Sequence, residues 1–249
     1  MRFAQPRIER ISEIDLRLDE RPWAFEAERA HHIDAHWREL TRRKPQLYNG
    51  RVLLLHRFAL AEREDGRRLE GACLMAQYKA FLAWRDFGFP DESVANIFAM
   101  GALLSADGAF LLGEMSSSTA NAGLIYFPAG TPDPGDLLGD RVDLEGSVLR
   151  ELEEETGIAA SEVAVDPGWS LVFQGPRLAC MKTLRSTLSA AELIARTAQF
   201  VAREKEPELT RLKAVFGLAD LDPRMPDFIV TYLRYVLASL SPLAERGSG

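Results

Sequence analysis

The apolar stretch from Val94 to Gly113 constrains the fold of this chain more than any other segment. It is about as long as a membrane-spanning helix, but polar residues interrupt it and Ser105-Ala106-Asp107-Gly108 has the composition of a tight turn. We therefore expect two paired strands, residues 97–104 and 109–113, rather than a membrane span.

Two different patterns flank this hairpin. Before it, the spacing predicts a helix over 24–43, strands over 51–60 and 68–75 around an Asp-Gly turn, and a short helix over 77–87. After it, we expect strands at 123–127, 170–173, 178–183 and 212–216, and helices beginning after Asp143, at Ser189 and at Pro226. The predicted fold class is α/β (α+β) with a mixed sheet, divided into an N-terminal α+β subdomain, residues 1–93, and a second domain, residues 94–249.

The charge balance limits the partners of the chain. Its 249 residues carry 30 Lys and Arg against 37 Asp and Glu, a formal net charge of −7, which argues against binding to a nucleic-acid backbone. The first residues lack the apolar segment of a signal peptide, and Cys73 and Cys180 lie far apart in apolar stretches. We expect a cytoplasmic protein with two buried free thiols and no membrane partner.

Three carboxylates share one face of the helix predicted after Asp143. Glu151, Glu154 and Glu155 lie at positions i, i+3 and i+4, while Leu152 points to another side. Such a cluster is unfavourable unless a cation lies within it, and hard divalent ions prefer oxygen ligands. An acidic, solvated helix face is the alternative interpretation of the same residues.

The surrounding sequence Arg150-Glu151-Leu152-Glu153-Glu154-Glu155-Thr156-Gly157-Ile158 resembles the core of the Nudix box, Arg-Glu-U-x-Glu-Glu-x-Gly-U with U aliphatic, at each specified position. A strand and a Pro-Ala-Gly loop precede it, as in that family. The resemblance implies an α/β/α sandwich and hydrolysis of a diphosphate joined to another group. It also implies that Glu151, Glu154 and Glu155 are ligands of Mg²⁺ or Mn²⁺ and that Arg150 orients a carboxylate.

The upstream half of the box departs from the family pattern. The usual glycine falls on Asp136 and the usual glutamate falls on Val142, so the loop after Gly130 is expected to be lengthened. Asp143 lies next to the missing glutamate, but its place before Leu144 favours an N-cap role.

A looser resemblance covers more of the chain. The helix with Trp37, the strand pair, the helix over 78–84 and the extended loop are similar in layout to the Nudix branch that hydrolyses UDP-glucose. This resemblance implies a nucleotide sugar as the substrate, cleaved to a nucleoside monophosphate and a sugar phosphate. Gly130, Tyr126 and Asn121, around the loop, are the predicted substrate-binding residues.

Other functions are kept open or set aside. Coenzyme A or a dinucleotide is the alternative substrate, and a nucleotide-binding regulatory module without turnover is the alternative function. The N-terminal subdomain is expected to contribute substrate contacts or a homodimer surface. The four histidines have no zinc-site spacing, Ser116-Ser117-Ser118 lacks the glycines of a nucleophile elbow, and Glu206 and Glu208 are weaker candidates for a distal acid.

Overall fold

The computed structural model describes residues 1–119 and 121–240, which form a mixed α+β fold with two sheets. The larger sheet has the strand order β1-β12-β13-β5-β6-β14, with β11, β7 and β8 pairing beside it, and the smaller one has the order β3-β4-β2-β10-β9. The helices are α1 (Ala24–Glu28), α2 (Ala30–Arg43), α3 (Tyr78–Asp86), α4 (Leu144–Thr156), α5 (Ala190–Val201) and α6 (Asp227–Leu240). The strands of the larger sheet are β1 (Phe3–Ile11), β5 (Asn96–Leu104), β6 (Phe110–Met115), β7 (Ile125–Tyr126), β8 (Ala129–Gly130), β11 (Val163–Val165), β12 (Trp169–Gly175), β13 (Arg177–Ser186) and β14 (Leu209–Val215). Those of the smaller sheet are β2 (Glu13–Leu18), β3 (Arg51–Arg63), β4 (Gly66–Gln77), β9 (Leu137–Leu138) and β10 (Arg141–Val142).

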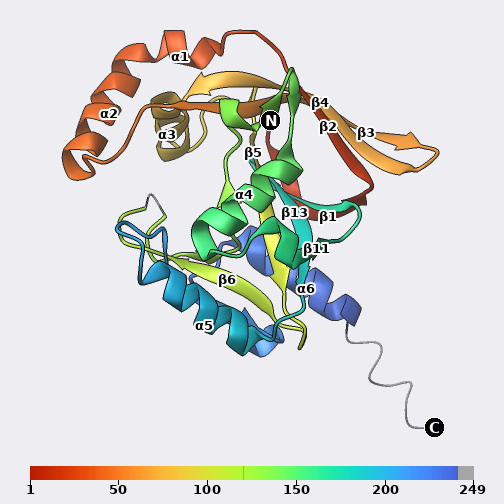
Figure 1. Ribbon diagram of the computed structural model, residues 1–249. Helices are drawn as coiled ribbons and strands as arrows, with labels where there is room; N and C mark the ends of the chain where they lie inside the picture. The colour runs from red at the N-terminus through yellow and green to blue at the C-terminus, as the bar shows by residue number, and fades with distance from the viewer. Residues whose placement is uncertain (120, 241–249) are drawn as a thin grey trace.

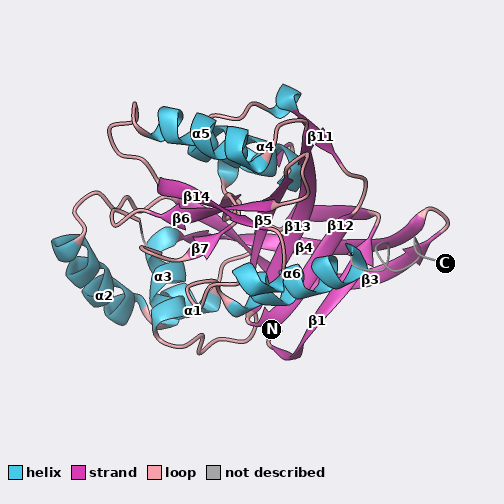
Figure 2. Cartoon of the chain, turned by 90° about the horizontal axis from the view of Figure 1, so that it is seen from below, coloured by secondary structure: helices cyan, strands magenta, loops and turns pink. Residues whose placement is uncertain are grey.

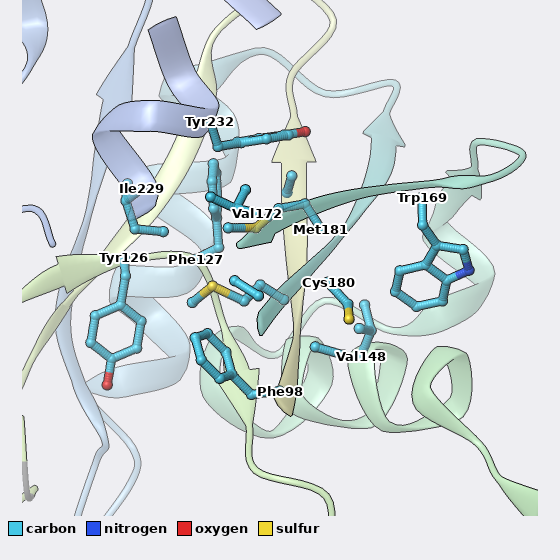
Figure 3. Packing of buried hydrophobic residues seen from close by; sticks show 14 of the residues in the cluster. Phe98, Tyr126, Phe127, Val148, Trp169, Val172, Cys180, Met181, Ile229 and Tyr232 are labelled. Atoms are coloured by element: carbon cyan, nitrogen blue, oxygen red, sulfur yellow. The ribbon is translucent and has the colours of Figure 1, made fainter. Parts of the chain in front are cut away.

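Helices cover both faces of the larger sheet. Helix α4 packs on β5, where Val148 lies against Gly101, and α5 packs on β14. Helix α6 covers the other face, where the ring of Tyr232 lies 5.8 Å from that of Phe127. Figure 3 shows Val148 and Tyr232 on opposite sides of the central strands. This α/β/α layering is the arrangement expected from the sequence.

The smaller sheet also has two buried faces. Val52 and Leu54 of β3 pack with Trp84 and the other apolar residues of α1–α3, whereas Leu53 and Leu55 belong to the core of the larger sheet. A strand covered on both faces has an unbroken apolar sequence, as residues 52–55 do. In Figures 1 and 2, α2 lies at the end of the molecule away from α5.

Each of the two sheets contains strands from both sides of the predicted division at residue 93. Strand β1 pairs with β12 in the larger sheet, and β10 pairs with β2 in the smaller sheet. The larger sheet therefore includes a strand from residues 1–93, and the smaller sheet includes strands from residues 94–249. The division of the chain at residue 93 stays a proposal.

The predicted elements differ from the observed ones at one helix and at several strands. The single helix predicted over 24–43 is wrong, because the chain turns at Arg29 and forms α1 and α2. Strands β1 and β2 and the short strands β8 to β11 were not predicted. In β2, charged and apolar residues alternate as in a half-buried strand, with Ile14 and Leu16 buried and Glu13 and Asp15 partly exposed, so its sequence does carry the signal of a strand.

Candidate active site

Helix α4 begins and ends as its sequence predicts. The Asp143 carboxylate accepts the Gly146 N–H at 3.0 Å, which makes Asp143 the N-cap. Gly157 ends the helix with a φ of 71°, in the left-handed region that glycine adopts without strain. Val148 and Leu152 are buried toward the sheet, whereas Glu151 and Glu155 lie against the loop that contains Gly130.

Glu155 is buried beside this loop. Its Oε1 accepts the Ala129 N–H at 3.0 Å, whereas its Oε2 is buried and has no hydrogen-bond partner among the described residues. Burial raises the pKa of Glu155 well above its ordinary value, and the Ala129 N–H opposes this rise only in part. An unpartnered carboxylate oxygen inside a protein is costly unless a ligand meets it.

Glu151 lies directly against Gly130. A methyl group at Gly130 would come within 2.4 Å of the Glu151 Oε1, so the absence of a side chain allows this close approach. The pKa of Glu151 is raised to about 7, first by burial; Arg150 opposes this rise, and Glu154 and Glu208 contribute to it. Strand β8 holds Gly130 in place by pairing with Ala99 of β5.

Arg150 connects three carboxylates. Its guanidinium lies 2.8 Å from the Asp136 Oδ1, 2.9 Å from the Glu151 Oε1 and 3.2 Å from the Glu154 Oε2. Asp136 is buried, and it holds Arg150 from the lengthened loop. Arg150 is therefore placed to orient Glu151, the positioning role that the sequence predicts for it.

The two departures from the family pattern have structural roles. Asp136 also accepts the Asp133 N–H at 3.0 Å and so shapes the loop. Val142 is buried in the core and lies in β10, where a glutamate would be out of contact with water.

A second group of acids faces the same end of α4. A cavity of about 410 Å³ is lined by Glu154, Glu155, Glu204, Glu206 and Glu208 together with Phe200, Val201 and Pro207. Glu208 has an exposed side chain, and the partial loss of water around its carboxylate together with the nearby Glu154 raises its pKa. The structure thus brings Glu208 to the predicted carboxylates, although it lies more than fifty residues away in the sequence.

No three side chains of His, Cys, Asp or Glu in the described residues are gathered closely enough to hold a metal ion as they stand. Glu154 is 60% exposed and turned to Arg150, while Glu151 and Glu155 lie against the loop. The donor set nevertheless fits a hard divalent cation, because the Glu155 Oε2 is unpartnered and the neighbouring charges are all carboxylates except Arg150.

A second cavity, of about 320 Å³, adjoins the loop on the side away from the acids and contains the predicted substrate residues. Asn121, Tyr126 and Gly130 line it, and the Asn121 Nδ2 donates to the Tyr126 hydroxyl at 3.1 Å. Arg85 and Arg177 also line this cavity, and sequence reasoning missed both. No local motif marks them, because Arg85 comes from helix α3 and Arg177 from strand β13, and the two meet only in the folded chain.

Cys73, Cys180 and Ser116 do not line either of the two cavities. Cys73 and Cys180 are buried free thiols, as predicted, and burial raises their pKa. The Ser116 hydroxyl is hydrogen-bonded to that of Ser118.

No helix within residues 1–119 and 121–240 is long and apolar enough to cross a membrane.

No family model and no curated protein sequence matches the chain. Among solved structures, it is similar to the Nudix domain of Shewanella oneidensis NrtR complexed with ADP-ribose, with 17% identity, a TM-score of 0.39, and coverage of 59% of this chain and 89% of that one. It is similar to a Caenorhabditis elegans Ap4A hydrolase, with 18% identity, a TM-score of 0.35, and coverage of 57% and 97%. It is also similar to DR0079 of Deinococcus radiodurans, with 13% identity, a TM-score of 0.38, and coverage of 66% and 82%.

The raised pKa of Glu151 leads to a prediction about the metal-free protein. The pKa is about 7 in the fold against an ordinary value of 4.5, so the stabilisation from this group is fully present below pH 4.5 and is lost as the pH rises through 7. The free energy of unfolding of the wild type minus that of Glu151→Gln is expected to fall by up to about 3 kcal/mol across this range.

Urea unfolding at several pH values, with a chelator present, measures this difference. Glu153→Gln is the matched control, because Glu153 is exposed on the same helix. A difference between wild type and Glu151→Gln that stays constant from pH 4.5 to 7.5 would contradict the assignment.

Proposed function

We propose that the chain is a metal-dependent Nudix-type hydrolase that cleaves the diphosphate linkage of a nucleoside diphosphate derivative. The observation that carries this proposal is the buried, unpartnered Oε2 of Glu155 next to Glu151, at the loop that separates the acids from a substrate-sized cavity. Two crowded carboxylates with raised pKa values reduce the stability of the ionised fold, which favours a role in catalysis over a solvated helix face.

Each residue would have a distinct role in this reaction. Glu151, Glu154 and Glu155 would hold Mg²⁺ or Mn²⁺, which when bound supplies charge neutralisation and activates water. Arg150 keeps Glu151 in place, and the Gly130 backbone lets the diphosphate approach the carboxylates closely. The Ala129 N–H fixes the Glu155 carboxylate through Oε1 and leaves Oε2 for the site.

The cavity beyond Gly130 would receive the organic part of the substrate. Aromatic rings and a few polar groups line it, which is typical of a nucleotide-derivative pocket. A nucleotide sugar such as UDP-glucose is the proposed substrate, with a nucleoside monophosphate and a sugar phosphate as products. The N-terminal part of the chain would contribute to binding through α3, since Tyr78, Phe81 and Arg85 line the cavity. A cytoplasmic location and a homodimer stay predictions from the sequence.

A substrate panel with and without metal tests this function. We expect release of phosphomonoesters from at least one nucleotide sugar with Mg²⁺ or Mn²⁺, loss of the activity with a chelator, and recovery when the metal is restored. Chromatographic separation of the intact compound from its two phosphomonoester products provides the readout. The panel includes coenzyme A and dinucleotides, and an absence of turnover on every diphosphate would favour the regulatory alternative.

A further inference from the structure

A guanidinium group without a carboxylate partner lies in the cavity of about 320 Å³. Arg177, the first residue of β13, is half-buried, and its guanidinium carbon lies 4.9 Å from the centre of the Phe89 ring. No described carboxylate lies within 4.0 Å of it in an ion pair, although most arginines of this chain have such a partner. Buried charges in proteins are normally paired, so the half-buried Arg177 favours an anionic ligand in this cavity.

A second arginine adds to the positive charge. Arg85 of α3 lines the same cavity, and only its Nε is engaged, donating to the Asp86 Oδ1 at 2.8 Å. The pKa of Arg177 is lowered first by burial and then by Arg85, while Asp227 raises it by less than Arg85 lowers it. The two guanidinium groups therefore repel each other in the protein alone, and an anion between them would relieve this repulsion.

Two amide side chains stand beside Arg177. The strand register places Gln174 of β12 and Asn96 of β5 directly opposite Arg177 on either side, so the three side chains lie on one face of the sheet. The Oε1 of Gln174 and the Oδ1 of Asn96 are buried and have no hydrogen-bond partner among the described residues. Both residues line the cavity, and free carbonyl oxygens in this place suit the hydroxyl groups of a sugar.

The register of β5 also gives the distance to the carboxylates. Ala99 pairs with Gly130, which touches Glu151, and Asn96 pairs with Arg177. These two points are offset by three residues along β5, about 10 Å, and they lie on opposite sides of β5, about 10 Å apart across the strands, so their backbones are about 14 Å from each other. A diphosphate at Gly130 and an anion at Arg177 would therefore have a sugar-sized group between them, with the long Arg177 side chain spanning the rest.

From this row of side chains we infer the class of substrate: a nucleoside diphosphate derivative with a second oxyanion, a phosphate or a carboxylate, on the sugar next to its diphosphate. Arg177 and Arg85 bind this oxyanion, and Asn96 and Gln174 accept hydrogen bonds from the sugar. The inference rests on the proposed function. It favours those nucleotide sugars and alternative substrates that carry a negative charge in addition to the diphosphate.

Matched pairs of compounds test the inference. Each pair differs only in the second oxyanion: UDP-glucuronate against UDP-glucose, ADP-ribose 2′-phosphate against ADP-ribose, and coenzyme A against its 3′-dephospho form. The wild type is expected to favour the charged member of at least one pair by about 10-fold or more in kcat/KM, since a charge-assisted hydrogen bond is roughly twice as strong as a neutral one. The pair that shows the preference identifies the oxyanion as a carboxylate or a phosphate.

Substitutions then identify the residues that cause the preference for the charged compound. Arg177→Gln and Arg85→Gln are each expected to bring the ratio of the two kcat/KM values close to one, and Arg177→Lys is expected to keep part of it. Arg234→Gln, at an exposed arginine of α6, is the matched control and keeps the wild-type ratio. No preference in any of the pairs, or a preference that survives both glutamine variants, would overturn the inference.

Binding measured by calorimetry in a chelator separates the two proposals. Hydrolysis without a charge preference would refute the second oxyanion and leave the proposed function standing. Tighter binding of the charged compound, lost in Arg177→Gln, with no hydrolysis of any compound, would keep the oxyanion site and refute the hydrolase.

Discussion

Replacing Glu155 by glutamine is expected to abolish hydrolysis while leaving the metal-free protein at least as stable as the wild type at pH 8. A glutamine keeps an oxygen for the Ala129 N–H, so the loop stays in place. It removes a carboxylate whose ionisation is opposed by burial and by Glu208, Glu151 and Glu154. The loss of one ligand charge costs several kcal/mol of transition-state stabilisation, on the order of 10³-fold in rate.

The two effects are measured separately. Steady-state hydrolysis with saturating Mg²⁺ gives the first, and urea unfolding in a chelator gives the second. Glu153→Gln makes the same chemical change two residues away on the exposed face of α4, and we expect it to alter neither quantity appreciably. If Glu155→Gln hydrolyses substrate like the wild type, Glu155 is no ligand of the metal.

Alanine at Gly130 is expected to lower kcat/KM by roughly 100-fold, because a displacement of about 1 Å in a catalytic group has an effect of this size. The new methyl group would lie 2.4 Å from the Glu151 Oε1 and 2.7 Å from its Cδ, so the carboxylate must move away from the loop. The atoms that it meets belong to the end of a flexible side chain. The change in the free energy of unfolding should therefore stay within about 1 kcal/mol.

Gly217→Ala is the matched control, since a methyl group there meets no atom within 4 Å and the backbone is extended. Both variants are compared by hydrolysis rate and by urea unfolding. Wild-type activity in Gly130→Ala would show that the position of Glu151 against the loop is unimportant. A loss of several kcal/mol of stability would show that the glycine has a structural role instead.

The parts of the fold that local sequence determines were predictable. Helix α4 has its own N-cap at Asp143, its own left-handed end at Gly157 and an apolar face, so its limits and its glutamates could be predicted from neighbouring residues. The α/β/α layering was implied by the family that the sequence of this helix resembles.

What depends on distant residues could not be predicted in this way. Arg177 stands beside Asn96 only because β13 and β5 pair in parallel, and that register leaves no trace in either segment alone. Glu208 reaches the carboxylates of α4 through the fold rather than through any spacing. The resemblance that identified Glu151 and Glu155 concerned chemistry shared by many substrates, whereas the cavity residues that would distinguish one substrate from another come from α3, β5, β12 and β13.

The pairing of β1 with β12 has a consequence for how this protein is made. Phe3 lies opposite Gly175 and Ile11 opposite Trp169, so β1 leaves the ribosome long before its partner exists. The backbone N–H and C=O groups of β1 therefore have no strand partner while more than half of the chain is translated. During this time an unpaired strand can associate with other chains and aggregate. The segment carries charges of both signs at Arg7, Glu9 and Arg10. These charges favour its solvation until β12 has been synthesised and can pair with it.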